Sequence, residues 1–389
     1  MMKILQLTNK NPWPPKDGEA IAILTMSKGF FLLGHQVTVL TMNVEGSTEL
    51  EEIPEQLTNQ ICIKRIDVKR RFCRKSFYPR LRNIGINEDF EKALTELLRE
   101  ENFDVIQIET LYLCQYIPLI RRFSNALVSY RVHNIEHEML QRSYKNAGFM
   151  SYLLTKPVKK LERSILNTYD VLITITEHDG ISLDRLGNKK PRFTSEVGID
   201  LSNLVPTAKD LEYPSLFHIG ALDWPPNQEG LVWFLNSCWP AIHKQFPDLK
   251  FYIAGRSGPS WIKMRFGSEH VIFLGEVEDA YQFMNSKAIM VVPLHSDSGM
   301  RIKIIEGMAL GKAIVSTKTG CEGIPVVNRE NILIADQPEE FLEAIKDLIT
   351  NYELFDLICQ NSVNFISGKY NYLTIVERLA HFYETSNKS

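Results

Sequence analysis

The stretch from Val292 to Gly311 combines an apolar strand, a turn of small residues and the start of a helix. Backbone N–H groups in the first turn of a helix have no partner within the helix, and the helix dipole favours negative charge beside them. Arg301 and Lys303 place two cations in this turn, where the dipole disfavours them. An anionic ligand bound at the turn would explain both cations.

A carboxylate further along the same helix extends this candidate site. Ser298 and Glu306 are eight positions apart, a separation of roughly 12 Å along a helix. That distance could span a diphosphate with a sugar at one end and a ribose at the other. The alternative is that Glu306 is only a carboxylate on the surface of the helix.

A second group of candidate residues follows an apolar run at Leu127–Val132. His133, Glu136 and His137 form the pattern H-x-x-E-H, which on a helix could hold zinc with the glutamate as base. No second motif offers a third ligand, and His133 directly follows a strand-like run. We therefore predict no metal site and place His133 in a loop at the end of a strand.

Short apolar runs rich in Val and Ile alternate with amphipathic stretches, a pattern typical of parallel β-α-β units. In the first half we expect strands at Lys3–Thr8, Gln36–Thr41, Val105–Ile108, Leu127–Arg131 and Val171–Thr176, with helices at Glu19–Leu33, Asp89–Glu100 and Lys156–Asn167. The pattern restarts after Leu201–Pro214, a polar linker with two prolines. In the second half we expect strands at Leu216–Ile219, Lys250–Ala254, Val271–Leu274 and Ala288–Pro293, with helices at Glu229–Lys244, Ile302–Leu310 and Glu339–Thr350. This order predicts two doubly wound α/β domains that bind ligands at the carboxyl ends of their strands.

The composition excludes several classes of protein. The chain has 389 residues with 44 basic and 47 acidic side chains, a net charge of −3, and 44% of its residues are hydrophobic. These values are ordinary for a globular protein and argue against disorder and against general polyanion binding. Six cysteines lack paired spacing, so we expect reduced thiols in a cytoplasmic protein. We see no signal-peptide pattern at the N-terminus and no apolar run long enough to span a membrane.

One segment departs from this balance of charge. Lys64–Arg82 holds nine basic residues and one acidic residue, a charge of +8, with aromatic side chains among them. Such a segment suits an anionic membrane surface, where each basic residue contributes about 1 kcal/mol. We predict a peripheral position on the inner face of the cell membrane, through a patch of Lys69, Arg70, Arg71, Arg74 and Lys75. The alternatives are a phosphorylated acceptor or a solvated loop and helix face. We expect no nucleic acid, because no module that reads it accompanies the segment.

Seven motifs occur in one order along the chain: KILQLTNKNPWPPKDGEA, GHQVTVLT, YRVHNIEHEML, SEVGID, FHIGALDWPPNQEG, FYIAGRS and RIKIIEGMALGKAIVSTKTGCEG. Together they resemble glycosyltransferase family 4, retaining enzymes of the two-domain GT-B fold, and the last motif resembles the R-x-K variant of the E-x7-E region. The resemblance covers essentially the whole chain. It implies an acceptor-side Rossmann-like domain at residues 1–203 and a nucleotide-sugar-binding Rossmann-like domain at residues 204–367, facing a cleft. A C-terminal helical segment at residues 368–389 is expected to pack back on the first domain.

The resemblance also assigns roles to individual residues. Glu306 would hold the ribose hydroxyls of the nucleotide. Cations would neutralise the departing diphosphate in place of a metal ion, so that no cofactor is needed; they are Arg301, Lys303 and Arg256. Further contacts to the nucleotide sugar are expected from Gly18, Gly220, Asn227, Ser298, Gly299 and Met300. His133 would contact the donor sugar near its reacting carbon, and Glu109 would contact the acceptor.

One position departs from the family pattern. Ser298 stands where the family usually has the first glutamate of E-x7-E, with Asp297 one residue earlier. Three explanations are open: Asp297 substitutes for the glutamate, this subgroup manages without it, or transfer is weak. We expect an active hexosyltransferase that uses a UDP-sugar and extends a lipid-linked or polysaccharide precursor. Its rivals are a sugar-nucleotide epimerase on the same fold and an inactive homologue that binds nucleotide or membrane.

Overall fold

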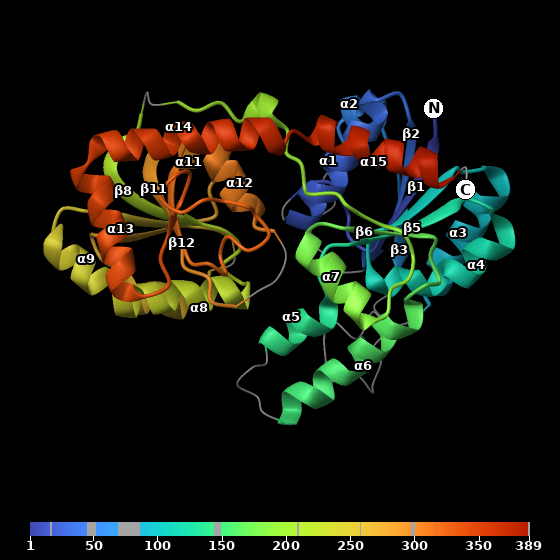
Figure 1. Ribbon diagram of the computed structural model, residues 1–389, viewed down its shortest axis with the longest axis horizontal. Coiled ribbons are helices and arrows are strands. Elements are labelled where there is room, and N and C mark those ends of the chain that lie inside the picture. The colour runs from blue at the N-terminus through green and yellow to red at the C-terminus, as the bar shows by residue number, and fades with distance from the viewer. Residues whose placement is uncertain are drawn as a thin grey trace. The chain divides into compact units, whose positions relative to one another are not determined.

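The computed structural model describes residues 1–15, 18–44, 52–68, 86–143, 149–207, 210–256, 258–296 and 300–387. The chain divides into two compact units, each with its own parallel sheet (Figure 1). Unit 1 comprises Met1–Gln141, Asn146–Gly198 and Tyr372–Ser389, and unit 2 comprises Arg142–Lys145 and Ile199–Asn371. The C-terminal segment therefore belongs with the first part of the chain, although it follows the second.

The sheet of unit 1 has seven strands in its described residues, in the order β3-β2-β1-β4-β5-β6-β7. The strands are β1 (Lys3–Thr8), β2 (Gln36–Val44), β3 (Cys62–Val68), β4 (Val105–Ile108), β5 (Leu127–Val132), β6 (Val171–Thr174) and β7 (Arg192–Thr194). The order reverses between β1 and β4, and ligands of doubly wound sheets bind beyond the carboxyl ends of the strands at such a reversal.

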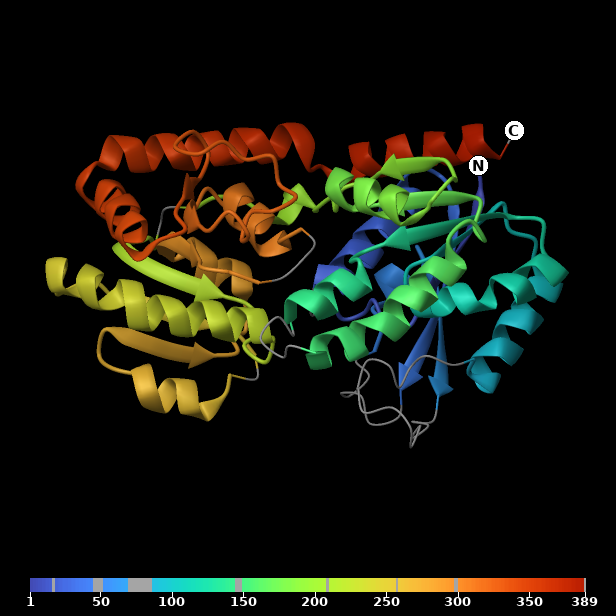
Figure 2. The same ribbon diagram turned by 60° about the horizontal axis from the view of Figure 1, so that its bottom comes forward.

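Helices cover both faces of this sheet (Figures 1 and 2). They are α1 (Gly18–Leu32), α2 (Glu55–Thr58), α3 (Glu88–Glu100), α4 (Ile117–Phe123), α5 (Glu136–Ser143), α6 (Phe149–Ile165), α7 (Glu177–Leu186) and α15 (Tyr372–Ser386). Because side chains alternate along a strand, β1 sends Leu5 and Leu7 into the core with α3, α4 and α6, and Ile4 into the core with α1 and α15.

The last helix, α15, completes the core of unit 1 and lies beside α1 (Figure 1). Val376, Leu379 and Tyr383 are at most 1% exposed. The contact with α1 is close, since a Cβ on Gly29 would lie 2.7 Å from Val376 Cγ2. Burial of this apolar face makes α15 part of the fold of unit 1.

Unit 2 repeats the same architecture, and its described residues form six strands in the order β10-β9-β8-β11-β12-β13. The strands are β8 (Glu212–Ile219), β9 (Phe251–Ala254), β10 (Val271–Gly275), β11 (Lys287–Val292), β12 (Ala313–Ser316) and β13 (Leu333–Ile334). The helices are α8 (Pro225–Trp233), α9 (Trp239–Gln245), α10 (Ser260–Phe266), α11 (Ala280–Asn285), α12 (Ile302–Ala309), α13 (Pro338–Thr350) and α14 (Tyr352–Lys369). The reversal of order falls between β8 and β11. Two parallel α/β sheets confirm the predicted fold class.

Several sequence-based expectations differ from the structure: β3, β7, β12 and β13 were not expected, and the helix expected from Lys156 begins at Phe149. The linker expected at Leu201–Pro214 is too long, because β8 already begins at Glu212. Pro214 is accommodated at a shift in register between β8 and β11, where the pairing passes from Glu212 to Leu216. The single helix expected at Glu229–Lys244 is two helices joined by a π-helical turn at Phe234–Cys238.

No helix in the described part of the chain is long and apolar enough to cross a membrane.

Candidate active site

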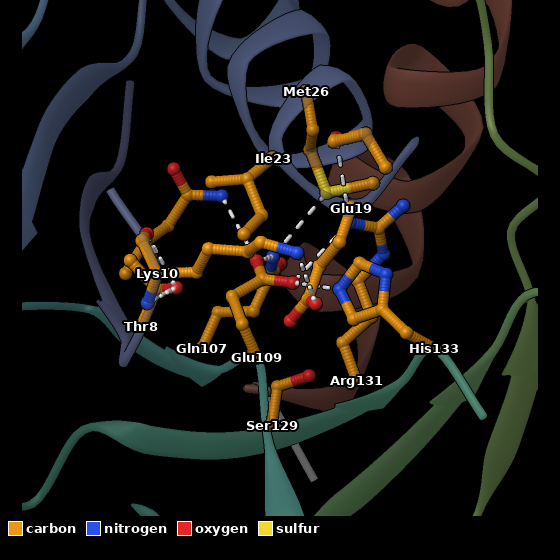
Figure 3. A network of polar contacts seen from close by, with 12 residues as sticks. Thr8, Lys10, Glu19, Ile23, Met26, Gln107, Glu109, Ser129, Arg131 and His133 are labelled. Carbon is orange, nitrogen blue, oxygen red and sulfur yellow. Dashed lines mark hydrogen bonds and ion pairs between the residues drawn. The ribbon is translucent and has the colours of Figure 1, made fainter. Parts of the chain in front are cut away.

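A row of buried polar side chains crosses the middle of the sheet in unit 1. Gln6 of β1 is in register with Gln107 of β4, which is in register with Ser129 of β5. All three side chains are completely buried. Because residues two apart on a strand share a face, Arg131 points to the same side as Ser129. This is the side covered by α1 and α15 (Figure 3).

These side chains surround the carboxylate of Glu109, which is enclosed by protein. Gln6 and Gln107 each donate a side-chain N–H to Oε1, the bond from Gln6 being 3.3 Å long. Arg131 donates to Oε2 at 3.3 Å. Burial acts to raise the pKa of Glu109, but the charge of Arg131 and these hydrogen bonds outweigh it and hold the pKa below its usual value. Glu109 is therefore ionised at neutral pH.

His133 completes the cluster from the loop that follows β5. Its Nε2 lies 2.8 Å from Glu109 Oε2. An ionised carboxylate has no proton to give, so His133 is the donor, and the bond fixes the orientation of its ring (Figure 3). The acceptor contact expected of Glu109 does not fit this burial, because its oxygens already face four protein donors. The geometry instead makes Glu109 the residue that orients His133.

The H-x-x-E-H pattern does not form a single site. Helix α5 begins at Glu136, so that His133 lies before it. His137 turns to Glu162 of α6, with its Nδ1 against Glu162 Oε2. Glu162 also accepts the backbone N–H of Glu136 at 2.8 Å and so caps the start of α5. The two histidines thus contact two different carboxylates.

In unit 2, the turn after β8 meets the first turn of α12 at the reversal of strand order. Lys303 Nζ donates to Asn227 Oδ1 at 2.9 Å, and Asn227 Nδ2 donates to the backbone oxygen of Ala221 at 2.7 Å. Gly220 has a φ of +154°, and a Cβ on it would lie 3.1 Å from Lys303 Nζ. Glycine therefore permits the close approach of this turn to the lysine, so that a cation lies beside the turn.

Glu306 lies three residues beyond Lys303, on the same face of α12. Its Oε1 accepts a 2.8 Å hydrogen bond from the hydroxyl of Tyr281. Asp279 caps α11 by accepting the backbone N–H of Tyr281 at 2.8 Å, which fixes the position of the tyrosine. Burial raises the pKa of Glu306 to about 7, against the opposing effect of the tyrosine. A plain carboxylate on the helix surface does not fit these observations.

Some of the remaining predicted site residues lie in the described part of the chain, and others lie outside it. Arg301 is the N-cap residue of α12 and is 7% exposed, and Met300 precedes it. Arg256 follows β9, and its backbone oxygen accepts the N–H of Leu222 at 3.0 Å. Gly18 begins α1 in unit 1. Outside the described residues lie Asp297, Ser298, Gly299 and the predicted membrane patch Lys69, Arg70, Arg71, Arg74 and Lys75.

The two units of the chain match two known family models. Residues 17–201 match the family model described as Glycosyltransferase Family 4, and residues 213–351 match the model described as Glycosyl transferases group 1. The chain is a glycosyltransferase family 4-like protein. It is a glycosyltransferase of the GT-B type, since it has two parallel-sheet α/β units and both units match glycosyltransferase models.

Three relatives of this glycosyltransferase illustrate the match. Sucrose-phosphate synthase from Thermosynechococcus elongatus has a TM-score of 0.79 at 16% identity, with 99% of each chain covered. HepE from Anabaena, solved with UDP-glucose, has a TM-score of 0.70 at 15% identity, with 99% of this chain and 100% of HepE covered. An uncharacterized 44.6 kDa protein in the cps region of Klebsiella pneumoniae is 23% identical over 95% of this chain and 97% of its own length.

Several residues of the glycosyltransferase clusters were missed by sequence reasoning. Gln6 interrupts an apolar strand, while Gln107 and Arg131 lie two residues from Glu109 and Ser129. This spacing of two could have placed each of these pairs on one face of its strand. Tyr281 carries no comparable signal. Gly255 was part of a motif but received no role, yet a Cβ on it would lie 1.8 Å from the backbone oxygen of Gly220.

Proposed function

We propose that this glycosyltransferase moves a hexose-type sugar from a UDP-sugar to a lipid-linked or polysaccharide-precursor acceptor, with retention of anomeric configuration. The observation that carries the nucleotide part is the arrangement on α12, where Lys303 lies beside the turn at Gly220 and Glu306 follows three residues later. A cation beside backbone N–H groups suits a diphosphate, and a carboxylate suits a pair of ribose hydroxyls. The complexes of HepE support UDP as the nucleotide.

In the proposed reaction, the bond from the anomeric carbon to the diphosphate oxygen breaks, and the acceptor oxygen bonds to that carbon from the same face. The acceptor proton passes to the departing phosphate oxygen, so that the protein supplies no strong base. Its part is to hold the two substrates in place and to stabilise the negative charge of the leaving group. Lys303, Arg301 and Arg256 would supply that charge stabilisation without a metal ion.

The proposed role of His133 is to contact the donor sugar in the orientation set by Glu109. Because the ring is already oriented, its contact with the sugar would cost no further side-chain conformational entropy. Binding and turnover then depend on different clusters, with nucleotide affinity resting on α12 and turnover also requiring His133.

The proposed acceptor side includes an anionic membrane. The basic segment Lys64–Arg82 supports this proposal by its charge. Only Lys64–Val68, within the edge strand β3, belongs to the described residues. A peripheral cytoplasmic enzyme would meet lipid-linked precursors at that surface.

The proposal is tested by offering the enzyme UDP-, GDP-, ADP- and dTDP-sugars in the presence of EDTA and a crude lipid extract. Release of one nucleoside diphosphate, dependent on the extract and absent in Glu306→Ala, would support a metal-independent transferase. NMR of the first product identifies the anomer formed. Release without any acceptor and with conversion to an isomeric sugar nucleotide would point to an epimerase. No release from any donor, with or without magnesium, would contradict the proposed function.

A further inference from the structure

The C-terminal helix reaches the polar cluster of unit 1 through one side chain. Tyr383 of α15 is completely buried, and its ring packs against Phe30 of α1 at a centroid distance of 6.3 Å. Its hydroxyl oxygen lies 2.7 Å from Gln107 Oε1 and 2.8 Å from Ser129 Oγ. The hydroxyl thus ends a buried chain of hydrogen bonds that leads through Gln107 and Glu109 to His133.

The direction of each bond in this chain follows from the carboxylate. Glu109 is ionised and can only accept, so Gln107 must present its NH2 group to it. The amide oxygen of Gln107 therefore faces away from Glu109, toward Tyr383. The Tyr383 hydroxyl donates its single proton to that oxygen. It therefore accepts the hydrogen bond from the Ser129 hydroxyl. Every donor and acceptor along the chain has one assignment.

On β1, the amide oxygen of Gln6 does not have a donor to itself. The Ser27 hydroxyl faces both Gln6 Oε1 and the backbone oxygen of Ile23, and its one proton is shared between them. The Tyr383 hydroxyl has Gln107 as its only acceptor among the described residues. Gln107 is thus the glutamine whose amide oxygen is held by the single proton of one tyrosine, while its amide nitrogen faces Glu109 and the sulfur of Met26.

We propose that Tyr383 is a positioning residue, which holds the amide of Gln107 so that Glu109 in turn holds His133. Without the hydroxyl, the buried amide oxygen of Gln107 loses its donor, while its NH2 group stays hydrogen-bonded to the ionised Glu109. The amide is then no longer held from the side of α15, and its shift changes the hydrogen bond that its NH2 group donates to Glu109. The carboxylate would move in response and carry the His133 ring with it. For its kinetic consequence this inference rests on the proposed function, but its structural consequence does not.

The test compares Tyr383→Phe with Tyr116→Phe in the full-length chain. Tyr116 is a matched control, since it is also buried and hydrogen-bonded through its hydroxyl, but to the backbone of Asn87. The first readout is the NMR resonance of the His133 imidazole N–H, assigned by its loss in His133→Gln. The second is donor turnover with UDP-glucose as the probe, separated into kcat and KM.

In Tyr383→Phe we expect the His133 N–H resonance to move and kcat to fall roughly tenfold, the effect of losing about one buried hydrogen bond. KM for the donor and the affinity for UDP should stay at the wild-type values. Tyr116→Phe should leave the resonance, kcat and KM unchanged. An unmoved resonance in folded Tyr383→Phe overturns the inference. So does an equal movement in both variants, which would report general loosening of the core.

Two further outcomes separate this inference from the proposed function. If wild-type protein turns over no nucleotide sugar but Tyr383→Phe still moves the His133 resonance, the positioning role stands and the proposed function fails. If Tyr383→Phe does not fold, Gln107→Met removes the amide that connects Tyr383 to Glu109. This variant should move the same His133 resonance. An unmoved resonance in Gln107→Met would then overturn the inference.

Discussion

The hydroxyl of Tyr281 donates a 2.8 Å hydrogen bond to Glu306 Oε1, joining α11 to the helix that carries the proposed nucleotide contacts. Burial raises the pKa of Glu306 to about 7, and the tyrosine opposes this rise. The carboxyl is therefore close to half ionised at neutral pH. A ligand whose hydroxyls donate to it would bind the ionised form, so the affinity for that ligand should depend on pH near neutrality.

The first prediction concerns this pH dependence. The affinity of wild-type protein for UDP-glucose should rise as pH rises through about 7, because Glu306 becomes ionised. Tyr281→Phe removes the opposing hydrogen bond, so the pKa of Glu306 and the midpoint of the affinity profile should move to higher pH. Calorimetric titration across this range measures both profiles. Glu306→Gln is the control and should be weak and independent of pH, while identical midpoints in wild type and Tyr281→Phe would refute the role of the tyrosine.

The second prediction concerns the buried ion pair of unit 1. Arg131 and Glu109 are both at most 1% exposed, with Arg131 Nη1 3.3 Å from Glu109 Oε2. Arg131→Met leaves a buried carboxylate short of its cation and should cost about 3–5 kcal/mol of unfolding free energy. Urea unfolding measures the loss. The double variant Arg131→Met/Glu109→Gln should recover part of it, and a single variant as stable as wild type would show that the pair contributes nothing.

Much of the fold could be predicted from the sequence, because apolar periodicity is a local property. The strands expected at Lys3–Thr8 and Val105–Ile108 have those bounds in the structure. The strand β8 was cut short because Pro214 suggested a linker, whereas a register shift accommodates it. The expectation that proline interrupts a strand holds for regular strand pairing. It fails at Pro214, where the register between two strands shifts.

The candidate site was predicted unevenly for a related reason. Gly220, Lys303 and Glu306 stand in motifs that carry the resemblance to family 4 glycosyltransferases, so these residues could be chosen from the sequence. The contact between Tyr383 and Gln107 joins residues 276 positions apart, and nothing local to either residue indicates the other. Sequence reasoning likewise assigned Glu109 to a substrate, because its burial and its four donors depend on strand register.

The third prediction tests the glycine turn of unit 2. Gly255 has a φ of +152°, and a Cβ on it would lie 1.8 Å from the backbone oxygen of Gly220. Gly255→Ala should therefore displace the turn at Gly220 and weaken UDP binding along with thermal stability. Gly368→Ala is the matched control, since no atom lies within 4 Å of the added Cβ. Its position in α14 should make it more stable by up to about 1 kcal/mol. Equal UDP binding by both variants and wild type would contradict the importance of this turn.

The fourth prediction concerns the membrane. Reversing the charge of Arg70, Arg71 and Arg74 should reduce cosedimentation with liposomes that contain anionic lipid, without change in the unfolding temperature. Each reversal removes an attraction of about 1 kcal/mol and adds a repulsion. Reversal of three exposed lysines in unit 2, Lys244, Lys250 and Lys346, provides a control of equal net charge. Equal loss of liposome binding in both triple variants would mean that only the total charge matters. No loss of binding in either variant would contradict the predicted membrane patch.

The most direct measurement of the central claim is calorimetric titration of the protein with UDP and with uridine in EDTA. The account predicts that UDP binds without metal and far more tightly than uridine. Lys303→Met should reduce the affinity for UDP by at least tenfold, as loss of a charge-assisted contact to the diphosphate requires, and leave the affinity for uridine unchanged. Binding of UDP that requires added magnesium, or that is equal in wild type and Lys303→Met, would contradict a site in which a protein cation holds the diphosphate.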